Sequence, residues 1–203
     1  MNLEAINQSL FLALNAPIDL SRFHLALAKV ASNNLIVVLM ALLALNCLLG
    51  GTRERRALLD IVLAVLLALG LNYVLGLVFP HPRPFMIGLG HTLVPHRAEG
   101  SFPSDHASAM WTIAWGMMLW SRARWSTWLA VTLAALTSWA RVFLGLHFPF
   151  DILGSMAAAV FAVGVVAALR PVIGQNIWQP IDSCYARVAK RVDQRRDRHG
   201  DPK

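Results

Sequence analysis

The sequence predicts an all-α fold: a polytopic membrane bundle of about five spanning helices, preceded by an N-terminal interfacial helix that is a candidate sixth. Composition supports this class, because 57% of the 203 residues are hydrophobic and only 14% are charged, whereas a soluble domain carries about a quarter charged residues. With weakly polar flanks, five apolar runs approach or exceed the roughly 17–20 residues that cross a bilayer core. These runs are 35–49, 57–79, 107–120, 128–146 and 152–169.

The chain is predicted to form a single domain, 1–203, with an interfacial segment at 1–22, a transmembrane core at 23–171 and a basic tail at 172–203. In the first segment, apolar residues follow a nearly helical stripe that stops at Pro17. Such a stripe, interrupted by polar groups, is typical of a helix that lies on the membrane surface. The stripe consists of Leu3, Ile6, Leu10 and Leu14.

The transmembrane core is expected to contain five spans in order. Between the second and third span, residues 80–103 are rich in Pro, Gly and His, which argues against a long helix there. After the last span, residues 172–196 are amphipathic and are predicted to lie along the inner surface. The predicted spans are 25–49, 57–79, 104–120, 125–145 and 150–169.

Positive charge indicates how the bundle is oriented. The net charge is +7, and 13 of the 18 Lys and Arg residues lie at 53–56, 122–124 and from 170 onward. Five spans place these three regions on one side, which the positive-inside rule assigns to the cytoplasm. The basic tail is then expected to contact anionic membrane lipids. This distribution argues against nucleic acid as a partner, and the sequence leaves the oligomeric state open.

The same topology gathers seven polar residues at the opposite, outer face, where five of the seven histidines also lie. Ionisable groups at membrane depth are costly and are usually functional. Taken alone, each of these residues could have an ordinary structural role instead of a catalytic one. A serine or aspartate can cap a helix, and an arginine near a helix end can reach the lipid headgroups. These alternatives do not explain why all seven gather on the face that should be poor in positive charge. They are Arg83, Ser104, Asp105, His106, Arg141, His147 and Asp151.

These residue types fit phosphoryl transfer without a metal or another cofactor. His147 and Asp151 are four positions apart, so a helical turn would let the carboxylate orient the imidazole. Arg83 and Arg141 offer planar forks of donors for phosphate oxygens. The paired arginines would repel a cation, and no zinc-type spacing of His or Cys is present.

The residues resemble the membrane phosphatidic acid phosphatase type 2 superfamily, whose motifs are Lys-x6-Arg-Pro, Pro-Ser-Gly-His and Ser-Arg-x5-His-x3-Asp. Here they correspond to Arg83-Pro84, to "PSDH" at 103–106 and to "ARVFLGLHFPFD" at 140–151. Gly76 stands where the family has lysine, so the phosphate contact of that lysine is either absent or replaced, with His81, His96 and Arg97 as the candidates. Asp105 and Ala140 also depart from the motifs, as glycine and serine would stand there.

The stretches "PRPF", "HTLVPH" and "SFPSDH" look like one branch of that superfamily, the bacitracin-resistance type of undecaprenyl diphosphatase. The resemblance implies removal of one phosphate from undecaprenyl diphosphate at the outer face of a bacterial inner membrane, which recycles the cell-wall carrier lipid. It assigns His147 as nucleophile, Asp151 as its orienting group and His106 as proton donor. It assigns Arg83, Arg141 and Ser104 to the phosphate oxygens, while Asp105 would help to place His106 or the diphosphate.

Two other functions stay open at this point. The enzyme could act on a different lipid phosphate, such as phosphatidylglycerophosphate, phosphatidic acid or lipid A, as a phosphatase or a phosphotransferase. A non-enzymatic lipid transporter is the alternative from another class. It would place polar groups through the midplane of the spans, where the sequence offers only Asn46, Asn72 and Thr132.

Overall fold

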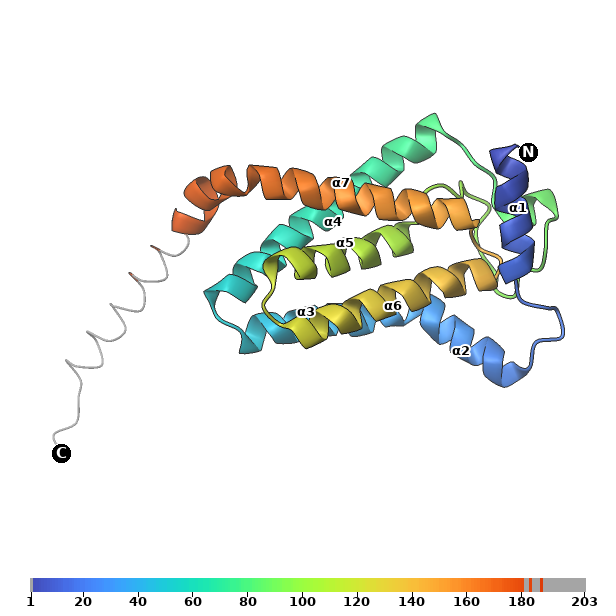
Figure 1. The fold of residues 1–203 in the computed structure, drawn as a ribbon, viewed down its shortest axis with the longest axis horizontal. Coiled ribbons are helices and arrows are strands. Elements are labelled where there is room, and N and C mark those ends of the chain that lie inside the picture. The colour runs from blue at the N-terminus through green and yellow to red at the C-terminus, as the bar shows by residue number, and fades with distance from the viewer. Residues whose placement is uncertain (1, 181–182, 184–186, 188–203) are drawn as a thin grey trace. The chain divides into compact units, whose positions relative to one another are not determined.

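The fold of this computed structural model is described for residues 2–180, 183 and 187, and every regular element among them is helical (Figure 1). The α-helices are α1 (Leu3–Leu14), α2 (Arg22–Asn33), α3 (Leu35–Leu49), α4 (Thr52–Val78), α5 (Asp105–Trp120), α6 (Arg124–Phe143) and α7 (Pro149–Ile173). A short 3-10 helix, η1 (Pro84–Ile87), interrupts the long connection between α4 and α5, and a π-helical stretch, η2 (Gly174–Trp178), follows α7. The predicted all-α membrane bundle is confirmed, as is the lack of a long helix at 80–103.

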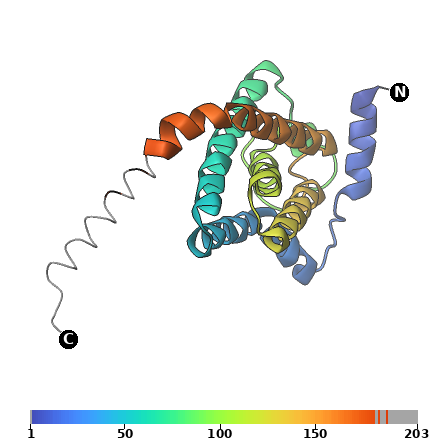
Figure 2. The same ribbon diagram turned by 60° about the vertical axis from the view of Figure 1, so that its left-hand side comes forward.

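Helix α5 is the central helix of the bundle. It packs against both α4 and α6, and α3, α4, α6 and α7 surround it when the bundle is turned (Figure 2). Of its 16 residues, 11 are buried. Gly116 allows α4 to approach closely, because a Cβ atom there would lie 2.6 Å from Ile61. A polar link joins α5 to α6, where the indole of Trp111 donates a hydrogen bond of 3.0 Å to Ser138.

The first predicted span, 25–49, is not one straight helix. The chain bends by 46° between α2 and α3, at the consecutive asparagines Asn33 and Asn34. Asparagine side chains compete with the backbone for hydrogen bonds and therefore disfavour helix interiors. Polar residues such as Arg22 and Lys29 also fall in α2, whereas α3 carries none that is charged.

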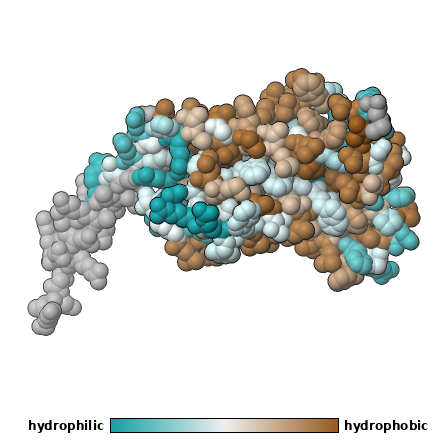
Figure 3. All heavy atoms as spheres, viewed as in Figure 1, coloured by the Kyte–Doolittle hydropathy of each residue, from teal (hydrophilic) through white to brown (hydrophobic). Residues whose placement is uncertain are grey.

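By length and composition, α4 and α7 can each cross a membrane, and the bent α2–α3 pair is a third candidate within the described residues. Helix α5 rises about 24 Å and is enclosed by its neighbours, so it needs little apolar surface of its own. Apolar side chains cover much of the face shown in Figure 3, between hydrophilic residues at the ends of the bundle. The predicted count of five spans stays a prediction.

The predicted N-terminal helix is present as α1, whose 12 residues rise about 18 Å and are too few to cross a bilayer core of about 30 Å. Its end is attached to the bundle, because the amide of Asn15 donates to the carbonyl oxygen of Phe143 at 3.1 Å. The backbone N–H of Ala16 donates to the same carbonyl at 2.9 Å. We therefore describe α1 as a short helix packed on the end of the bundle where α6 stops.

The chain divides into two compact units, Met1–Val165 and Val166–Lys203. The first contains α1 to α6 and most of α7, and all features discussed below lie in it. The second begins inside α7, and its described part includes η2. The predicted single domain stays a prediction, and most of the predicted amphipathic segment and basic tail lies outside the described residues.

Candidate active site

The sequence-predicted residues come from five separate segments that meet at one end of the bundle. Arg83 precedes η1, Ser104 occupies the N-cap position of α5, and Arg141 lies in the last turn of α6. His147 lies in the turn between α6 and α7, and Asp151 is in the first turn of α7. All five are buried, with exposures from 0% to 6%. The predicted convergence is therefore present in the structure.

His147 is held on both ring nitrogens. Its Nδ1 atom lies 2.9 Å from the backbone carbonyl oxygen of Ser101 and 3.5 Å from Oδ2 of Asp151. Its Nε2 atom lies 3.1 Å from Nη1 of Arg83 and 3.2 Å from Nη2 of Arg141. A carbonyl oxygen can only accept and a guanidinium can only donate, so the proton belongs on Nδ1 and the lone pair on Nε2. This tautomer directs a nucleophilic nitrogen at the two arginines.

The surroundings keep that imidazole neutral. Burial lowers the pKa of His147 to about 4, against the opposing influence of its hydrogen bond with Asp151. The positive charges of Arg141 and Arg83 lower the pKa further. At neutral pH the Nε2 lone pair is therefore available to attack phosphorus, as a nucleophile must be.

Asp151 is fixed by the start of α7. Its Oδ2 atom accepts a hydrogen bond of 2.8 Å from the backbone N–H of Phe148, just before the helix begins at Pro149. This is the reciprocal half of a capping box, in which the third helical residue reaches back to the cap. The same oxygen accepts a hydrogen bond from the hydroxyl of Ser101. The carboxylate thus orients His147 from a rigid position.

The two arginines differ in how they are held. Arg83 donates from Nε to the carbonyl oxygen of Glu99 at 3.1 Å and from Nη1 to that of Leu146 at 2.9 Å. Burial lowers the pKa of Arg83, and the negative charge of Asp151 acts in the opposite direction. Arg141 has no such backbone partners among the described residues, and its buried Nε atom makes no hydrogen bond.

Ser104 also has an unused polar atom. Its backbone N–H and carbonyl are both bonded to the hydroxyl of Ser155 on α7, at 2.9 Å and 3.0 Å. Its own hydroxyl is buried and has no hydrogen-bond partner in the described structure. A buried polar group without a partner is costly unless a ligand satisfies it. The hydroxyl of Ser104 and Nε of Arg141 therefore indicate where an oxygen-rich ligand would bind.

His106 and Asp105 lie beside this cluster rather than within it. His106 is half-buried on the first turn of α5. Asp105 is exposed and accepts a hydrogen bond of 2.9 Å from the amide of Asn72 on α4. That amide also donates to Ser108 at 2.9 Å. Asp105 is thus held toward α4, and no hydrogen bond joins it to His106 in the described part of the chain.

The three candidates for the missing family lysine have different surroundings. His96 has its Nε2 atom 3.5 Å from Nη2 of Arg141. His81 instead lies between Asp151 and Glu4 of α1, at 3.7 Å and 3.4 Å. Arg97 is 88% exposed and pairs with Glu99 at 3.8 Å. Of the three, His96 is the one in contact with the arginine pair.

A groove of about 580 Å³ lies beside Gly76, between α4 and the segment 99–105. Apolar side chains of α4 line one wall, including Leu69, Tyr73 and Leu77. Asp105 and Phe102 are among the residues of the other wall. Tyr73 and Leu77 are 71% and 66% exposed, so this wall continues onto the outer surface of α4. The groove is large enough for an apolar chain to lie beside the segment 99–105.

Two residues that sequence reasoning missed support His147. Ser101 contacts both His147 and Asp151, and nothing in its spacing to them indicates this. Gly145 has a φ of 80°, in the left-handed region that favours glycine. A Cβ atom at this position would collide with the backbone carbonyl of His91. A glycine two residues before His147 is the sequence signal that could have found Gly145.

The chain is similar to several known proteins. The family model of the PAP2 superfamily matches residues 57–174. YbjG of Escherichia coli (strain K12), which is provisionally named as an undecaprenyl-diphosphatase, is 34% identical over 183 residues, covering 90% of this chain and 92% of that protein. The undecaprenyl-diphosphatase BcrC of Bacillus subtilis (strain 168) is 37% identical over 125 residues, covering 62% and 64%.

A solved structure shares the fold. The crystal structure of Aquifex aeolicus LpxE has a TM-score of 0.65 and 22% identity, and the match covers 83% of this chain and 99% of that one. The family match covers more than half of the chain, and it includes the segments that hold Arg83, Ser104, Arg141, His147 and Asp151. The chain therefore belongs to the PAP2 superfamily, the phosphatidic acid phosphatase type 2 superfamily that its motifs resemble.

Proposed function

We propose that this membrane protein is a lipid phosphatase that hydrolyses undecaprenyl diphosphate to undecaprenyl phosphate and inorganic phosphate. The observation that carries the proposal is the arrangement around His147, whose Nε2 atom faces two guanidiniums while Nδ1 is held by Ser101. The two relatives named as undecaprenyl-diphosphatases support the choice of substrate. Such an enzyme would recycle the carrier lipid of cell-wall synthesis and confer resistance to bacitracin.

In the first step, Nε2 of His147 attacks the terminal phosphorus. The N–P bond forms, and the bond between phosphorus and the bridging oxygen breaks. The phosphate oxygens replace Nε2 as acceptors for Arg83 and Arg141, and they take up the unused hydroxyl of Ser104. These donors stabilise the charge of the transition state. His106 gives its proton to the departing lipid phosphate.

In the second step, the phosphohistidine is hydrolysed. His106, now neutral, removes a proton from a water molecule as that water attacks phosphorus. The N–P bond breaks, inorganic phosphate leaves, and the electron pair returns to Nε2 of His147. Asp151 and Ser101 hold the ring through both steps, because they contact the nitrogen that does not react. No metal takes part in either step.

The apolar groove beside α4 supports a lipid substrate. A polyprenyl chain lying against Tyr73 and Leu77 would leave its diphosphate at the end of the bundle where the arginines lie. We place this end at the outer face of a bacterial inner membrane and the basic tail in the cytoplasm. That orientation rests on the distribution of Lys and Arg in the sequence.

The proposal is tested by phosphate release from purified lipids in detergent. We expect undecaprenyl diphosphate to be hydrolysed faster than phosphatidylglycerophosphate, phosphatidic acid or a lipid A phosphate. His147→Ala should abolish release while its circular dichroism and thermal unfolding match those of the parent. A rate close to that of the parent would contradict the role of His147. Preference for another lipid would contradict the substrate, and binding without release would favour a transporter.

A further inference from the structure

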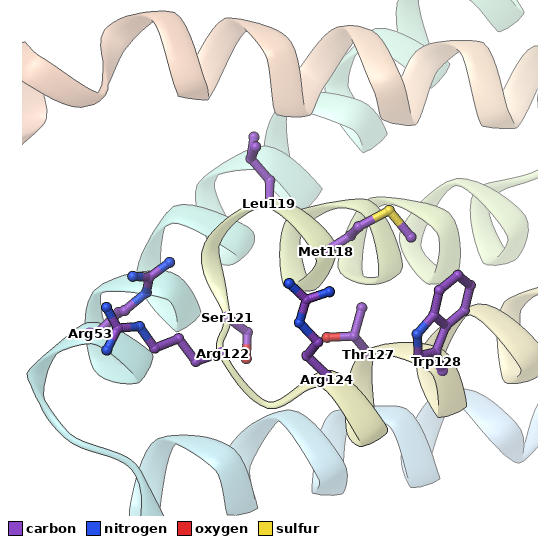
Figure 4. Close-up of a pocket in the computed structure, with 8 residues that line it drawn as sticks. All are labelled: Arg53, Met118, Leu119, Ser121, Arg122, Arg124, Thr127 and Trp128. Carbon is purple, nitrogen blue, oxygen red and sulfur yellow. The ribbon is translucent and has the colours of Figure 1, made fainter.

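A second polar site lies at the opposite end of the bundle, where α5 ends and α6 begins. A cavity of about 620 Å³ opens there. Because α5 rises about 24 Å from its start at the catalytic end, this cavity is separate from the arginine pair around His147. Its lining includes Arg53 of α4, Arg122 of the α5–α6 turn and Arg124 of α6, beside Met118, Leu119 and Trp128 (Figure 4).

Within the described residues, no salt bridge joins any of the three arginines to a carboxylate. Arg53 is anchored because its Nε atom donates to the carbonyl oxygen of Trp120 at 3.1 Å, which leaves both terminal nitrogens of its guanidinium for other acceptors. The guanidiniums of Arg122 and Arg124 pair with no carboxylate among the described residues. Glu54 is nearby, but its Oε1 atom accepts a hydrogen bond of 2.8 Å from the backbone N–H of Arg122 rather than from a guanidinium. The cavity therefore carries excess positive charge.

Exposed apolar side chains adjoin these donors. Leu119 is 53% exposed, Met118 is 43% exposed and Trp128 is 63% exposed. Figure 4 shows Arg53 and Arg122 toward one end of the cavity and Trp128 toward the other, with Arg124 between them. Tryptophan is enriched where a membrane helix meets the headgroup layer. Three cationic forks beside apolar surface, at the ends of helices of a membrane protein, match the two halves of a phospholipid.

We propose that this cavity, lined by Arg53, Arg122 and Arg124, binds the phosphate headgroup of an anionic phospholipid from the leaflet opposite to the catalytic cluster. Guanidiniums bind phosphate oxygens through paired donors, and basic pockets between membrane helices suit anionic headgroups. The acyl chains would lie along Met118 and Leu119. A free anion would use the same guanidiniums but would gain nothing from the apolar side chains.

The test measures binding of phosphatidylglycerol to the purified full chain by native mass spectrometry in detergent. Phosphatidylcholine and inorganic phosphate serve as parallel probes. Variants are Arg53→Gln, Arg122→Gln, Arg124→Gln and the triple variant. Arg55→Gln is the matched control, because Arg55 is exposed on the same turn of α4 and does not line the cavity. Phosphate-release activity confirms that each variant is folded.

We expect each single variant to weaken phosphatidylglycerol binding about fivefold and the triple variant about a hundredfold. Arg55→Gln should change it less than about twofold, and phosphatidylcholine should bind more weakly. The proposal is wrong if the triple variant binds as the parent does, or if Arg55→Gln weakens binding as much as the others. If inorganic phosphate binds as tightly as the lipid, the proposal of a lipid site is wrong and the cavity is a site for small anions.

Arg53 also has a structural hydrogen bond, so its variants could unfold for that reason alone. The double variant Arg122→Gln/Arg124→Gln removes only side chains without such partners in the described structure. We expect it to bind phosphatidylglycerol about 25-fold more weakly. Unchanged binding in this folded variant would overturn the proposal even if every Arg53 variant failed to fold.

Discussion

The backbone carbonyl oxygen of Ser101 lies 2.9 Å from Nδ1 of His147. It is nearer than the carboxylate of Asp151, which lies 3.5 Å from the same nitrogen. Because that partner is backbone, no side-chain substitution removes it. The imidazole is therefore oriented by two acceptors, of which only one can be deleted by mutation.

Loss of the Asp151 carboxylate is predicted to lower kcat more than loss of the Ser101 hydroxyl that holds this carboxylate. Asp151→Asn removes the negative charge beside His147 and should lower kcat about 100-fold. Ser101→Ala keeps the carbonyl acceptor but removes the hydrogen bond of the hydroxyl to Asp151 and its 3.4 Å contact with Nδ1 of His147, so it should cost about 10-fold. Phosphate release at saturating substrate measures both. Equal losses would show that the hydroxyl of Ser101 does more than hold the carboxylate.

Lysine should not replace either arginine. Arg141→Lys keeps the positive charge but loses the planar fork that donates to His147 and is aimed at the phosphate oxygens. We expect kcat to fall about 10²- to 10³-fold, the usual effect of removing one transition-state donor. Arg97→Lys is the control, because its side chain is 88% exposed. Full activity of Arg141→Lys would mean that charge alone suffices.

Arg83→Lys is predicted to have a second effect besides the loss of a phosphate donor. Arg83 also bonds the carbonyl oxygens of Glu99 and Leu146, so its replacement should loosen the turn that carries His147. We expect a lower temperature of unfolding in addition to a loss of kcat, whereas Arg141→Lys should unfold near the parent temperature. Thermal unfolding of the two variants side by side separates the two roles.

The pKa of His147 should lie well below that of an ordinary histidine. An unperturbed histidine has a pKa near 6.5, and burial lowers that of His147 to about 4. The neutral imidazole should therefore persist from pH 8 down to about pH 4, and activity limited by the nucleophile should be lost only below that range. An NMR titration of labelled histidine, with the signal identified by its absence in His147→Ala, measures this directly. Protonation near pH 6.5 would contradict the burial of the ring.

The stability of the folded state should also depend on the protonation of His147. A group whose pKa is lower in the folded than in the unfolded chain favours folding above the unfolded pKa. The contribution of His147 should therefore be complete above about pH 6.5 and fall progressively as the pH drops toward 4. His147→Gln, which cannot be protonated, should show a smaller loss of thermal stability over this interval than the parent.

Removal of divalent cations should leave the rate unchanged within about twofold, because in the proposed mechanism guanidiniums rather than a metal neutralise the phosphate. No group of three or more His, Cys, Asp or Glu side chains that could hold a metal occurs within the described residues. Phosphate release is measured with and without EDTA, using enzyme purified without added metal. A loss of activity that magnesium, calcium or zinc restores would require a metal-dependent mechanism.

The sequence was sufficient to predict the helices around the site and the side chains that meet there. Helix α5 begins at Asp105 and α6 ends at Phe143, close to the predicted limits, because apolar runs and their polar ends are local signals. The break between α2 and α3 was missed, since two asparagines in an apolar run look like ordinary weak polarity.

The contacts of Ser101 were also missed, because they depend on how the segment 80–103 folds back onto the bundle, and the spacing of residues along the sequence does not indicate this. Asp105 was predicted beside His106 or the diphosphate, yet its hydrogen bond is with Asn72 on a neighbouring helix.

Gly145 has a consequence for how such an enzyme can diversify. A Cβ atom at position 145 would collide with the backbone of His91, so a larger residue there would push apart the turn that carries His147 and the start of the loop that leads to His96. His147, the proposed nucleophile, and His96, which lies beside Arg141, therefore both depend on the close packing at Gly145. If the groove holds the lipid tail as proposed, substrate preference would be changed through the wall formed by Leu69, Tyr73 and Leu77, which lies away from Gly145 in the sequence. An engineer who wishes to alter the lipid tail would randomise this wall and leave position 145 untouched.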